Sequence, residues 1–210
     1  MKIIKNILLS ILAFVTFFFV IVFLIKRSSL KNLNMELNEI NSEWTKLYDS
    51  TNSRLFLLNE INTSCLIKQV DLDTLKAAIL KNRKHRNLYK KECNLDFNKL
   101  EFDVNKLYLM LQKKLRSVLV DSLCVIDREN IKILDKVKTK DQTCNAIEHS
   151  YNMMVDDYNI KVSTFPQSLF AKKNGLVPKK YFNMNYGIEN EDPIEKNKKI
   201  NEWILKGDSL

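Results

Sequence analysis

The hydrophobic positions of this chain follow helical periodicity almost throughout. An uncharged apolar run covers Ile7–Ile25, and apolar residues at heptad spacing then continue from Ser29 to about Leu66. Stripes of the same kind predict three further helices, at about 71–91, 95–120 and 127–165. All Gly and Pro residues lie beyond residue 165. Because sheets need such turn residues far more often, the pattern predicts an all-α protein.

Each predicted helix has a single apolar face, so these faces must pack together to be stable. Asp71 or Asp73 is a suitable N-cap for the second helix, and Pro166 ends the last one. The connections are short, which favours antiparallel neighbours. We predict a transmembrane helix followed by an antiparallel up-down-up-down four-helix bundle with long first and last helices. The predicted domains are an anchor at 1–28, a bundle at 29–166 and a membrane-proximal tail at 167–210.

The first apolar run has the length of a membrane span, since about 20 apolar residues in a helix cross a bilayer core. Lys2 and Lys5 precede the run, and Lys26 and Arg27 follow it, so the positive-inside rule leaves the orientation open. A cleaved signal peptide is the alternative. Its apolar core would be shorter and would end at a small-residue site, which LIKRSSLKNL lacks. We therefore expect an uncleaved single-pass anchor.

The formal net charge of +9 favours anionic surroundings. Lys and Arg are spread along the chain without a nucleic-acid-binding motif, so nucleic acid is not an expected partner. Phospholipid headgroups offer a simpler reason for the excess of Lys. The basic run at 81–91 is interpreted as a solvated helix face, with a patch for membrane or an acidic partner as the alternative.

The end of the last predicted helix carries the most regular pattern in the chain. Its apolar stripe, with steps of four and three residues, consists of Tyr151, Val155, Tyr158, Val162 and Phe165. Asn152 and Asn159 lie seven residues apart beside this stripe. Buried Asn fixes register in coiled coils, so our hypothesis is that both amides clamp the last helix to the first near Trp44. The hydroxyls of Tyr151 and Tyr158 would assist.

Candidate catalytic chemistry is sparse. His85 and His149 belong to no metal-binding motif, and no GxSxG, P-loop or GxGxxG sequence occurs. We interpret both histidines as surface residues and expect no cofactor, no metal and no small-molecule substrate. An unrecognised hydrolase is the least favoured function, because no nucleophile–base pair is evident.

The four cysteines allow two interpretations. In the predicted bundle Cys65 lies at the depth of Cys124, and Cys93 at the depth of Cys144. Two disulfides between these pairs would imply an oxidising compartment. The alternative is four thiols used as small core residues. Distances between the paired Cα atoms beyond about 7 Å would exclude the bridges.

The tail mixes aromatic residues with Lys. This combination suits a strip that lies against lipid headgroups or against the base of the first helix. The residues of this candidate membrane-interface strip are Phe170, Lys172, Lys173, Lys179, Lys180, Tyr181 and Phe182. Membrane remodelling or lipid contact through this strip is therefore an alternative function.

Two motifs together resemble the LemA family. The longer one is Tyr151-Asn152-x-x-Val155-x-x-Tyr158-Asn159-x-x-Val162-x-x-Phe165-Pro166-x-x-Leu169-x-Ala171, followed by Gly175-Leu176 and Tyr181-Phe182. The weaker one comprises Trp44, Arg54, Leu57, Leu58 and Ile61. Asn59 and Glu60 depart from the Pro and Asn of that segment, and Glu148 stands where the family has a basic residue.

The resemblance implies a bacterial single-pass membrane protein with an antiparallel helical bundle and no established enzymatic activity. Relatives include a protein of magnetosome membranes, and others lie near membrane metalloproteases in genomes. We therefore expect a non-enzymatic scaffold or interaction platform at the bacterial membrane. Its partner is an unidentified protein, with a membrane protease or self-association as candidates, and the side of the membrane that holds the bundle stays open.

Overall fold

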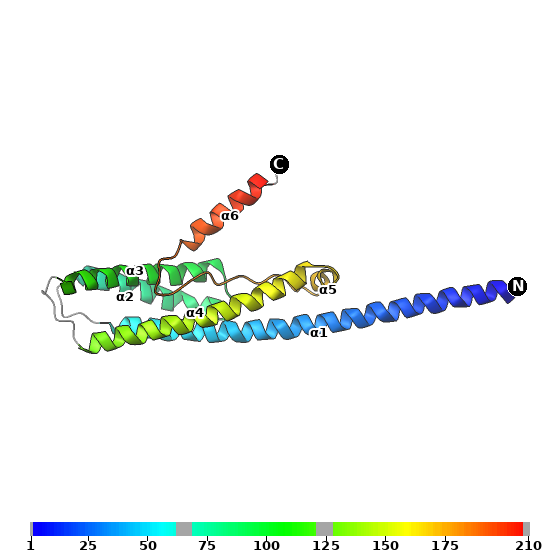
Figure 1. Ribbon diagram of the computed structural model, residues 1–210, viewed down its shortest axis with the longest axis horizontal. Helices are drawn as coiled ribbons and strands as arrows, with labels where there is room; N and C mark the ends of the chain where they lie inside the picture. Colours follow the sequence, from blue (N-terminus) through cyan, green and yellow to red (C-terminus); the bar gives the residue numbers. More distant parts are fainter. Residues whose placement is uncertain (1, 62–68, 121–127, 208–210) are drawn as a thin grey trace. The chain divides into compact units, whose positions relative to one another are not determined.

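The structure is a computed structural model that describes residues 2–61, 69–120 and 128–207. Within these ranges the chain is all-helical, as predicted, and contains no strand (Figure 1). The helices are α1 (Lys2–Glu60), α2 (Gln69–His85), the 3-10 helix η1 (Arg86–Tyr89), α3 (Leu95–Val120), α4 (Arg128–Ser163), α5 (Gln167–Lys173) and α6 (Pro193–Gly207).

The observed helices lie where the pattern predicts them, but several ends differ: α1 ends at Glu60 instead of about Leu66, and α2 ends at His85 instead of about Lys91. α3 has the predicted bounds. α2 begins at Gln69, so Asp71 and Asp73 lie inside the helix and neither is its N-cap. Asp71 instead pairs with Lys114 of α3, with 2.6 Å between its Oδ2 and the lysine Nζ. α4 ends at Ser163, so Phe165 has left the helix and is 79% exposed instead of packed on the apolar stripe.

A further correction concerns the basic run at 81–91, which covers the end of α2 and the residues that follow it. Most of its side chains are exposed, as a solvated face requires, but Arg86 is only 2% exposed. Arg86 begins η1, and its Nη2 donates to Tyr48 O at 3.0 Å and to Thr51 Oγ1 at 2.8 Å, both on α1. This side chain therefore packs into the protein because α1 provides acceptors for it.

α1 is one unbroken helix that begins at Lys2, contains the apolar run and continues through Glu60. It is long and apolar enough to cross a membrane. The large apolar side chains between Leu9 and Ile25 are exposed, including Phe14 and Phe19. An exposed apolar surface of this extent indicates that surroundings outside the chain cover it.

The chain divides into two compact units, described here separately. The first comprises residues 1–39 and 154–179. In this unit Leu33 of α1 and Val155 of α4 are buried, and the Lys161 Nζ lies 2.6 Å from the Glu36 Oε1.

The second unit comprises residues 40–153 and 180–210. Its hydrophobic core draws on α1, α2, α3 and α4. The buried members are Leu55, Leu58, Ile61, Leu72, Leu75, Ile79, Val104, Tyr108, Leu111 and Val137. Their spacing within each helix is the three- and four-residue spacing of the sequence pattern, so the predicted stripes are the buried faces.

An aromatic cluster forms a second part of this core around Trp44. The Trp44 ring lies 5.2 Å from Phe97, 5.5 Å from Tyr151 and 6.2 Å from Phe182, measured between ring centroids. Its indole Nε1 donates to Tyr89 O at 3.1 Å. Tilted and edge-to-face rings with a satisfied indole N–H are the favourable arrangement for buried aromatic residues.

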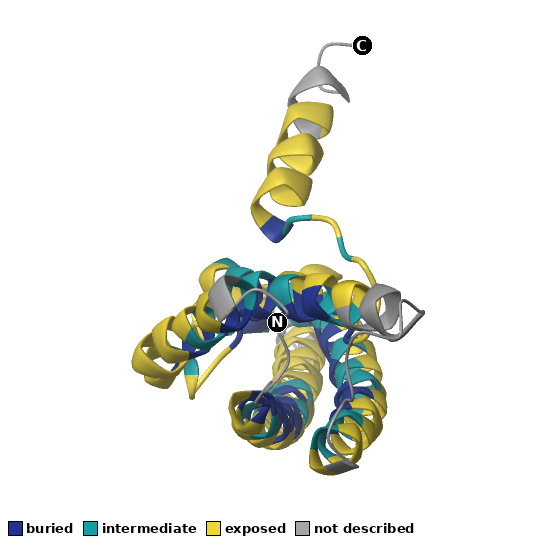
Figure 2. Ribbon diagram, turned by 90° about the vertical axis from the view of Figure 1, so that its left-hand side faces the viewer, coloured by how far each residue is buried: buried dark blue, intermediate teal, exposed yellow. Residues whose placement is uncertain are grey.

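α6 differs from the other helices of the second unit because nearly all of its described residues are exposed (Figure 2). Trp203 is 75% exposed, and Ile194 and Ile200 are exposed as well. The helix is joined to α3 near its start, where Lys99 Nζ lies 2.6 Å from Asp192 Oδ2.

Candidate functional site

A segment of irregular structure that precedes α6 lies against the helices of the second unit. We call residues 180–188 the extended segment. Its residues alternate between buried and exposed. The buried ones are Phe182, Met184 and Tyr186. Alternation of this kind is the signature of an extended backbone, yet no strand lies beside it in the described residues.

Asparagine side chains bond to the backbone of the extended segment. On α4, Asn152 Oδ1 accepts from Phe182 N–H at 2.9 Å and its Nδ2 donates to Phe182 O at 2.7 Å. Asn145 makes the same two bonds to Tyr186, at 2.8 and 3.1 Å. Each amide thus pairs with one residue as a neighbouring strand would.

α3 contributes two more asparagines from the other side. Asn98 accepts from Asn183 N–H and donates to Tyr181 O, both at 3.2 Å. Asn105 donates to Ile188 O at 3.1 Å. We call Asn98, Asn105, Asn145 and Asn152 the asparagine ladder. Both pairs are seven residues apart, which places each pair on one face of its helix.

In the first unit Asn159 repeats the arrangement. Its Oδ1 accepts from Lys179 N–H at 2.7 Å, and its Nδ2 donates to Lys179 O at 2.9 Å. Asn159 lies seven residues after Asn152, so α4 presents three amides with the same contact.

These contacts correct the hypothesis that Asn152 and Asn159 clamp α4 to α1. Both bond to backbone that follows α5, and Tyr151 Oη donates to Lys180 O at 2.8 Å. The Tyr158 hydroxyl has no hydrogen-bond partner in the part of the chain described. The reason is that buried backbone N–H and C=O groups require partners, and a strand-free segment must obtain them from side chains.

Sequence reasoning missed three ladder members. The signal was available, because Asn145 precedes Asn152 by seven residues and Asn98 precedes Asn105 by seven. Asparagine at a repeated heptad position, beside an apolar stripe, indicates a buried polar contact. The spacing alone does not say whether that contact is a helix or an extended segment.

Arg54 occupies the centre of the second unit and is fully buried. Its Nε donates to Asp141 Oδ1 at 2.5 Å, and its Nη2 donates to Asn105 Oδ1 at 3.0 Å. Its guanidinium carbon lies 4.3 Å from the centroid of the Tyr186 ring. Arg54 therefore links α1, α3 and α4 to the extended segment.

A second buried ion pair lies beside the first. Arg86 Nη1 lies 3.3 Å from Glu101 Oε1, and Tyr186 Oη donates to Glu101 Oε2 at 2.8 Å. Burial and the Glu101 carboxylate raise the pKa of Tyr186 well above its ordinary value. The hydroxyl therefore stays protonated and acts as a fixed donor, and the arrangement holds charges in place instead of moving protons.

Two of the four cysteines are described, and both are buried free thiols. Of the two interpretations, the Cys93–Cys144 bridge is therefore wrong and small core thiols describe these two residues: Cys93 Sγ contacts Tyr181 O at 3.4 Å, whereas Cys144 Sγ lies 3.3 Å from Ser50 Oγ. Burial raises the pKa of the Cys144 thiol to about 11 and raises that of Cys93 further. The proposed Cys65–Cys124 bridge lies outside the described residues.

The candidate membrane-interface strip is divided by the structure. Phe182 is fully buried in the aromatic cluster, so its assignment to a lipid-facing strip is wrong. The physical reason is the alternation of the extended segment, which directs every second side chain inward. Phe170 and Lys179 are half-buried, and the remaining members are exposed, namely Lys172, Lys173, Lys180 and Tyr181.

The other motif residues lie where helix packing was predicted. Trp44, Tyr151, Val155, Tyr158 and Val162 are buried. Pro166 follows the end of α4 and directly precedes α5. Among the described residues no group of three or more His, Cys, Asp or Glu side chains is close enough to hold a metal ion.

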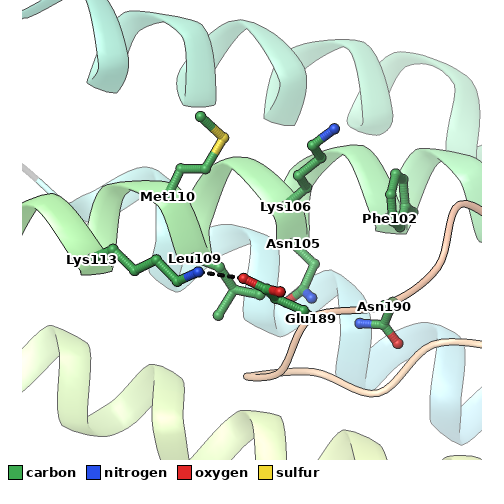
Figure 3. A pocket seen from close by; sticks show the side chains of 8 residues that line it. All are labelled: Phe102, Asn105, Lys106, Leu109, Met110, Lys113, Glu189 and Asn190. Carbon is green, nitrogen blue, oxygen red and sulfur yellow. Dashed lines mark hydrogen bonds and ion pairs between the residues drawn. The ribbon is translucent and has the colours of Figure 1, made fainter.

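A pocket of about 290 Å³ opens beside ladder residue Asn105 (Figure 3). Phe102, Leu109 and Met110 of α3 give it apolar walls. Lys113 extends toward Glu189 and forms an ion pair with it. The pocket therefore lies where the extended segment leaves α3, and it adds apolar surface to that side of the protein.

The secondary structure of the residues that the structure describes is all-helical. One of these helices is long and apolar enough to cross a membrane. Residues 127–195 match the model of the LemA family. The match confirms the resemblance to the LemA family and identifies this region of the chain as LemA-like. It includes α4 with Asn145, Asn152 and Asn159, and the whole extended segment. No curated protein and no solved structure matches the chain.

Proposed function

We propose that this protein is a membrane-anchored interaction platform of the LemA type, a non-enzymatic scaffold that crosses the bacterial membrane once. The supporting observation is that a single helix, α1, contains both the apolar run and core residues of the second unit. Confinement to a membrane raises the effective concentration of the helical body toward other membrane proteins. Placement, and not chemistry, is the mechanism in this proposal.

The body of the platform, in this proposal, is the up-down-up-down bundle expected from the sequence. Its support is the order of contacts within the second unit. Ser50 of α1 contacts Cys144 of α4. Arg54, which comes later in α1, contacts Asp141, which comes earlier in α4. The pairs between α2 and α3 have the same order, with Asp71 to Lys114 and Asn82 to Glu101. Opposite order of this kind is expected of antiparallel neighbours.

The test is site-specific photo-crosslinking in cells from exposed positions on three helices of the body: Leu80 of α2, Met110 of α3 and Ile131 of α4. The expected result is capture of one protein, a membrane protease or a second copy, from one of these positions. Capture should disappear when residues 1–28 are deleted, because the platform then leaves the membrane. Identical capture with and without the anchor, or none from any position, would contradict the proposal.

Lipid contact through the tail is a second candidate, favoured by one observation. α5 exposes Lys172 and Lys173 in its last turn, and Leu169 is exposed on the same short helix. A spin label at residue 172 of the reconstituted full chain should report headgroup depth by its accessibility to oxygen. A label that is fully accessible to aqueous nickel complex, like a control label at the exposed Lys138, would exclude this candidate.

A further inference from the structure

A second pocket lies between α1 and the basic turn that follows α2, and the LemA match does not cover it. Its volume is about 320 Å³. The lining residues are Tyr48, Asp49, Asn52, Phe56, Arg83, Arg86, Asn87 and Lys90. Arg83, Arg86 and Lys90 carry positive charge here, against the single carboxylate of Asp49. All of these residues belong to the second unit.

Arg86 places a buried guanidinium, paired with the Glu101 carboxylate, in the wall of this pocket. Its guanidinium is 2% exposed and is held by four acceptors, which are Asn82 Oδ1 at 3.2 Å, Glu101 Oε1 at 3.3 Å, Tyr48 O at 3.0 Å and Thr51 Oγ1 at 2.8 Å. Its Nε has no hydrogen-bond partner in the described part of the chain. A buried donor without a partner calls for an explanation, and an acceptor from a ligand is one.

The two other cations, Arg83 and Lys90, are exposed. The Arg83 guanidinium carbon lies 4.4 Å from the centroid of the Phe56 ring, which holds its stem beside the pocket. Asn87 Oδ1 accepts from the Tyr48 hydroxyl at 3.1 Å, so the amide nitrogen of Asn87 is its donor side. The pocket thus offers Arg, Lys and amide donors, the groups that recognise phosphate oxygens.

Exposed positive charges outside the pocket also attract anions. Lys81, Lys84 and Lys91 are exposed on the same stretch of chain. Their summed potential raises the local concentration of anions at the pocket mouth. We infer that this pocket binds a phosphate group, either as a free phosphate or as the headgroup of a lipid. This inference does not depend on the proposed platform function.

The first arm of the test uses the full chain in nanodiscs of neutral phosphatidylcholine, titrated calorimetrically with inorganic phosphate and, as a reference, with chloride at matched ionic strength. We expect saturable binding of phosphate that chloride does not reproduce. Arg83→Gln and Lys90→Gln should each weaken it about tenfold, because each removes one charge-assisted hydrogen bond. Lys81→Gln is the matched control, since it removes an exposed charge outside the pocket lining, and should weaken binding far less than either lining variant.

The second arm distinguishes the source of the phosphate group. Soluble short-chain phosphatidic acid is titrated into the same nanodiscs. If phosphatidic acid competes with inorganic phosphate and binds more tightly, the ligand is a lipid headgroup. If only inorganic phosphate binds, the ligand is a free phosphate. Absence of saturable binding in both arms would overturn the inference. An equal loss in Lys81→Gln would also overturn it, because a diffuse field would then explain the binding.

Discussion

At the scale of single residues, asparagine takes the part that a neighbouring strand has in a sheet. A peptide group has one donor and one acceptor, and the carboxamide of Asn presents the same pair at the end of a short side chain. Asn145 and Asn152 each satisfy both backbone groups of one residue in the extended segment. A helix can therefore bind an extended backbone without a strand being present.

Replacing Asn152 with Asp tests this role. The substitution keeps the size of the side chain but removes the N–H that donates to Phe182 O at 2.7 Å, and it places a carboxylate against that carbonyl. We expect a loss of roughly 1–3 kcal/mol in the free energy of unfolding, measured by denaturant titration. Asn38→Asp on an exposed position of α1 is the matched control and should change stability by less than about 0.5 kcal/mol. Equal effects of both variants would show that the amide contact is dispensable.

Cys144 gives a pH prediction at the same scale. Burial raises its pKa to about 11, against the ordinary cysteine pKa of 9.0, which applies to the unfolded chain. Because the folded state disfavours the thiolate, stability is full below the unfolded pKa and falls as the pH rises toward the folded value. Each unit of difference corresponds to about 1.4 kcal/mol, so we expect a loss of about 2–3 kcal/mol from this thiol between pH 9 and 11.

The measurement is the free energy of unfolding against pH, compared with that of Cys144→Ala. The parent should lose more stability over this range than the variant, because other groups titrate equally in both. A parallel pH dependence of the two proteins would contradict the assigned pKa. Native Cys144 should also react slowly with iodoacetamide at pH 8, since the thiolate is the reactive form.

At the scale of elements, the pair of Arg54 and Asp141 joins α1 to α4 in the second unit. Removing one partner leaves a buried charge without its counterion, which costs about 3–5 kcal/mol. We expect this loss for Asp141→Asn, measured by denaturant titration. The double variant Arg54→Met/Asp141→Leu should recover most of it, because two apolar side chains carry no desolvation cost. A double variant as unstable as the single one would mean that the other Arg54 contacts dominate.

The two faces of the extended segment differ in burial, and this difference can be tested by substitution. Phe182 is fully buried in the aromatic cluster, whereas Tyr181 is 38% exposed. Phe182→Ala should destabilise the protein by about 3–5 kcal/mol through the cavity it leaves. Tyr181→Ala is the neighbouring control and should cost less than about 1 kcal/mol. Similar losses at both positions would indicate that the alternation has no energetic consequence.

The helices were predictable from the sequence because each carries its own apolar period. Leu95–Val120 shows this best, since its apolar residues recur at helical spacing and the observed bounds equal the predicted ones. The extended segment was not predicted, although Phe182, Met184 and Tyr186 have the period of two that an extended chain requires. Mixed with Lys, this short pattern also fits a membrane-surface strip. Its partners, Asn98 and Asn145, are distant in sequence, so only the tertiary fold selects between the two interpretations.

At the scale of the whole molecule, the apolar run of α1 is the feature that no contact among the described residues explains. Its large side chains are exposed, and the same helix supplies core residues such as Leu55. A lipid bilayer could cover the run without leaving backbone N–H and C=O groups unpaired, because a helix satisfies its own hydrogen bonds. Hydropathy in the sequence and exposure in the structure both lead to this point.

Charges placed in the middle of that run test the anchor. Each Lys at the centre of a bilayer costs about 2.5–3.5 kcal/mol on insertion scales, so Phe14→Lys/Phe18→Lys should cost roughly 5–7 kcal/mol and release the protein from carbonate-washed membranes. Met35→Lys is the matched control, because Met35 is an exposed residue of the same helix outside the run, and this variant should stay in the membrane fraction. Retention of the double-lysine variant after the wash would mean that a part of the chain other than α1 holds it to the membrane. In that case the platform would be anchored by its tail, and the exposed Lys172 and Lys173 would be the first residues to replace.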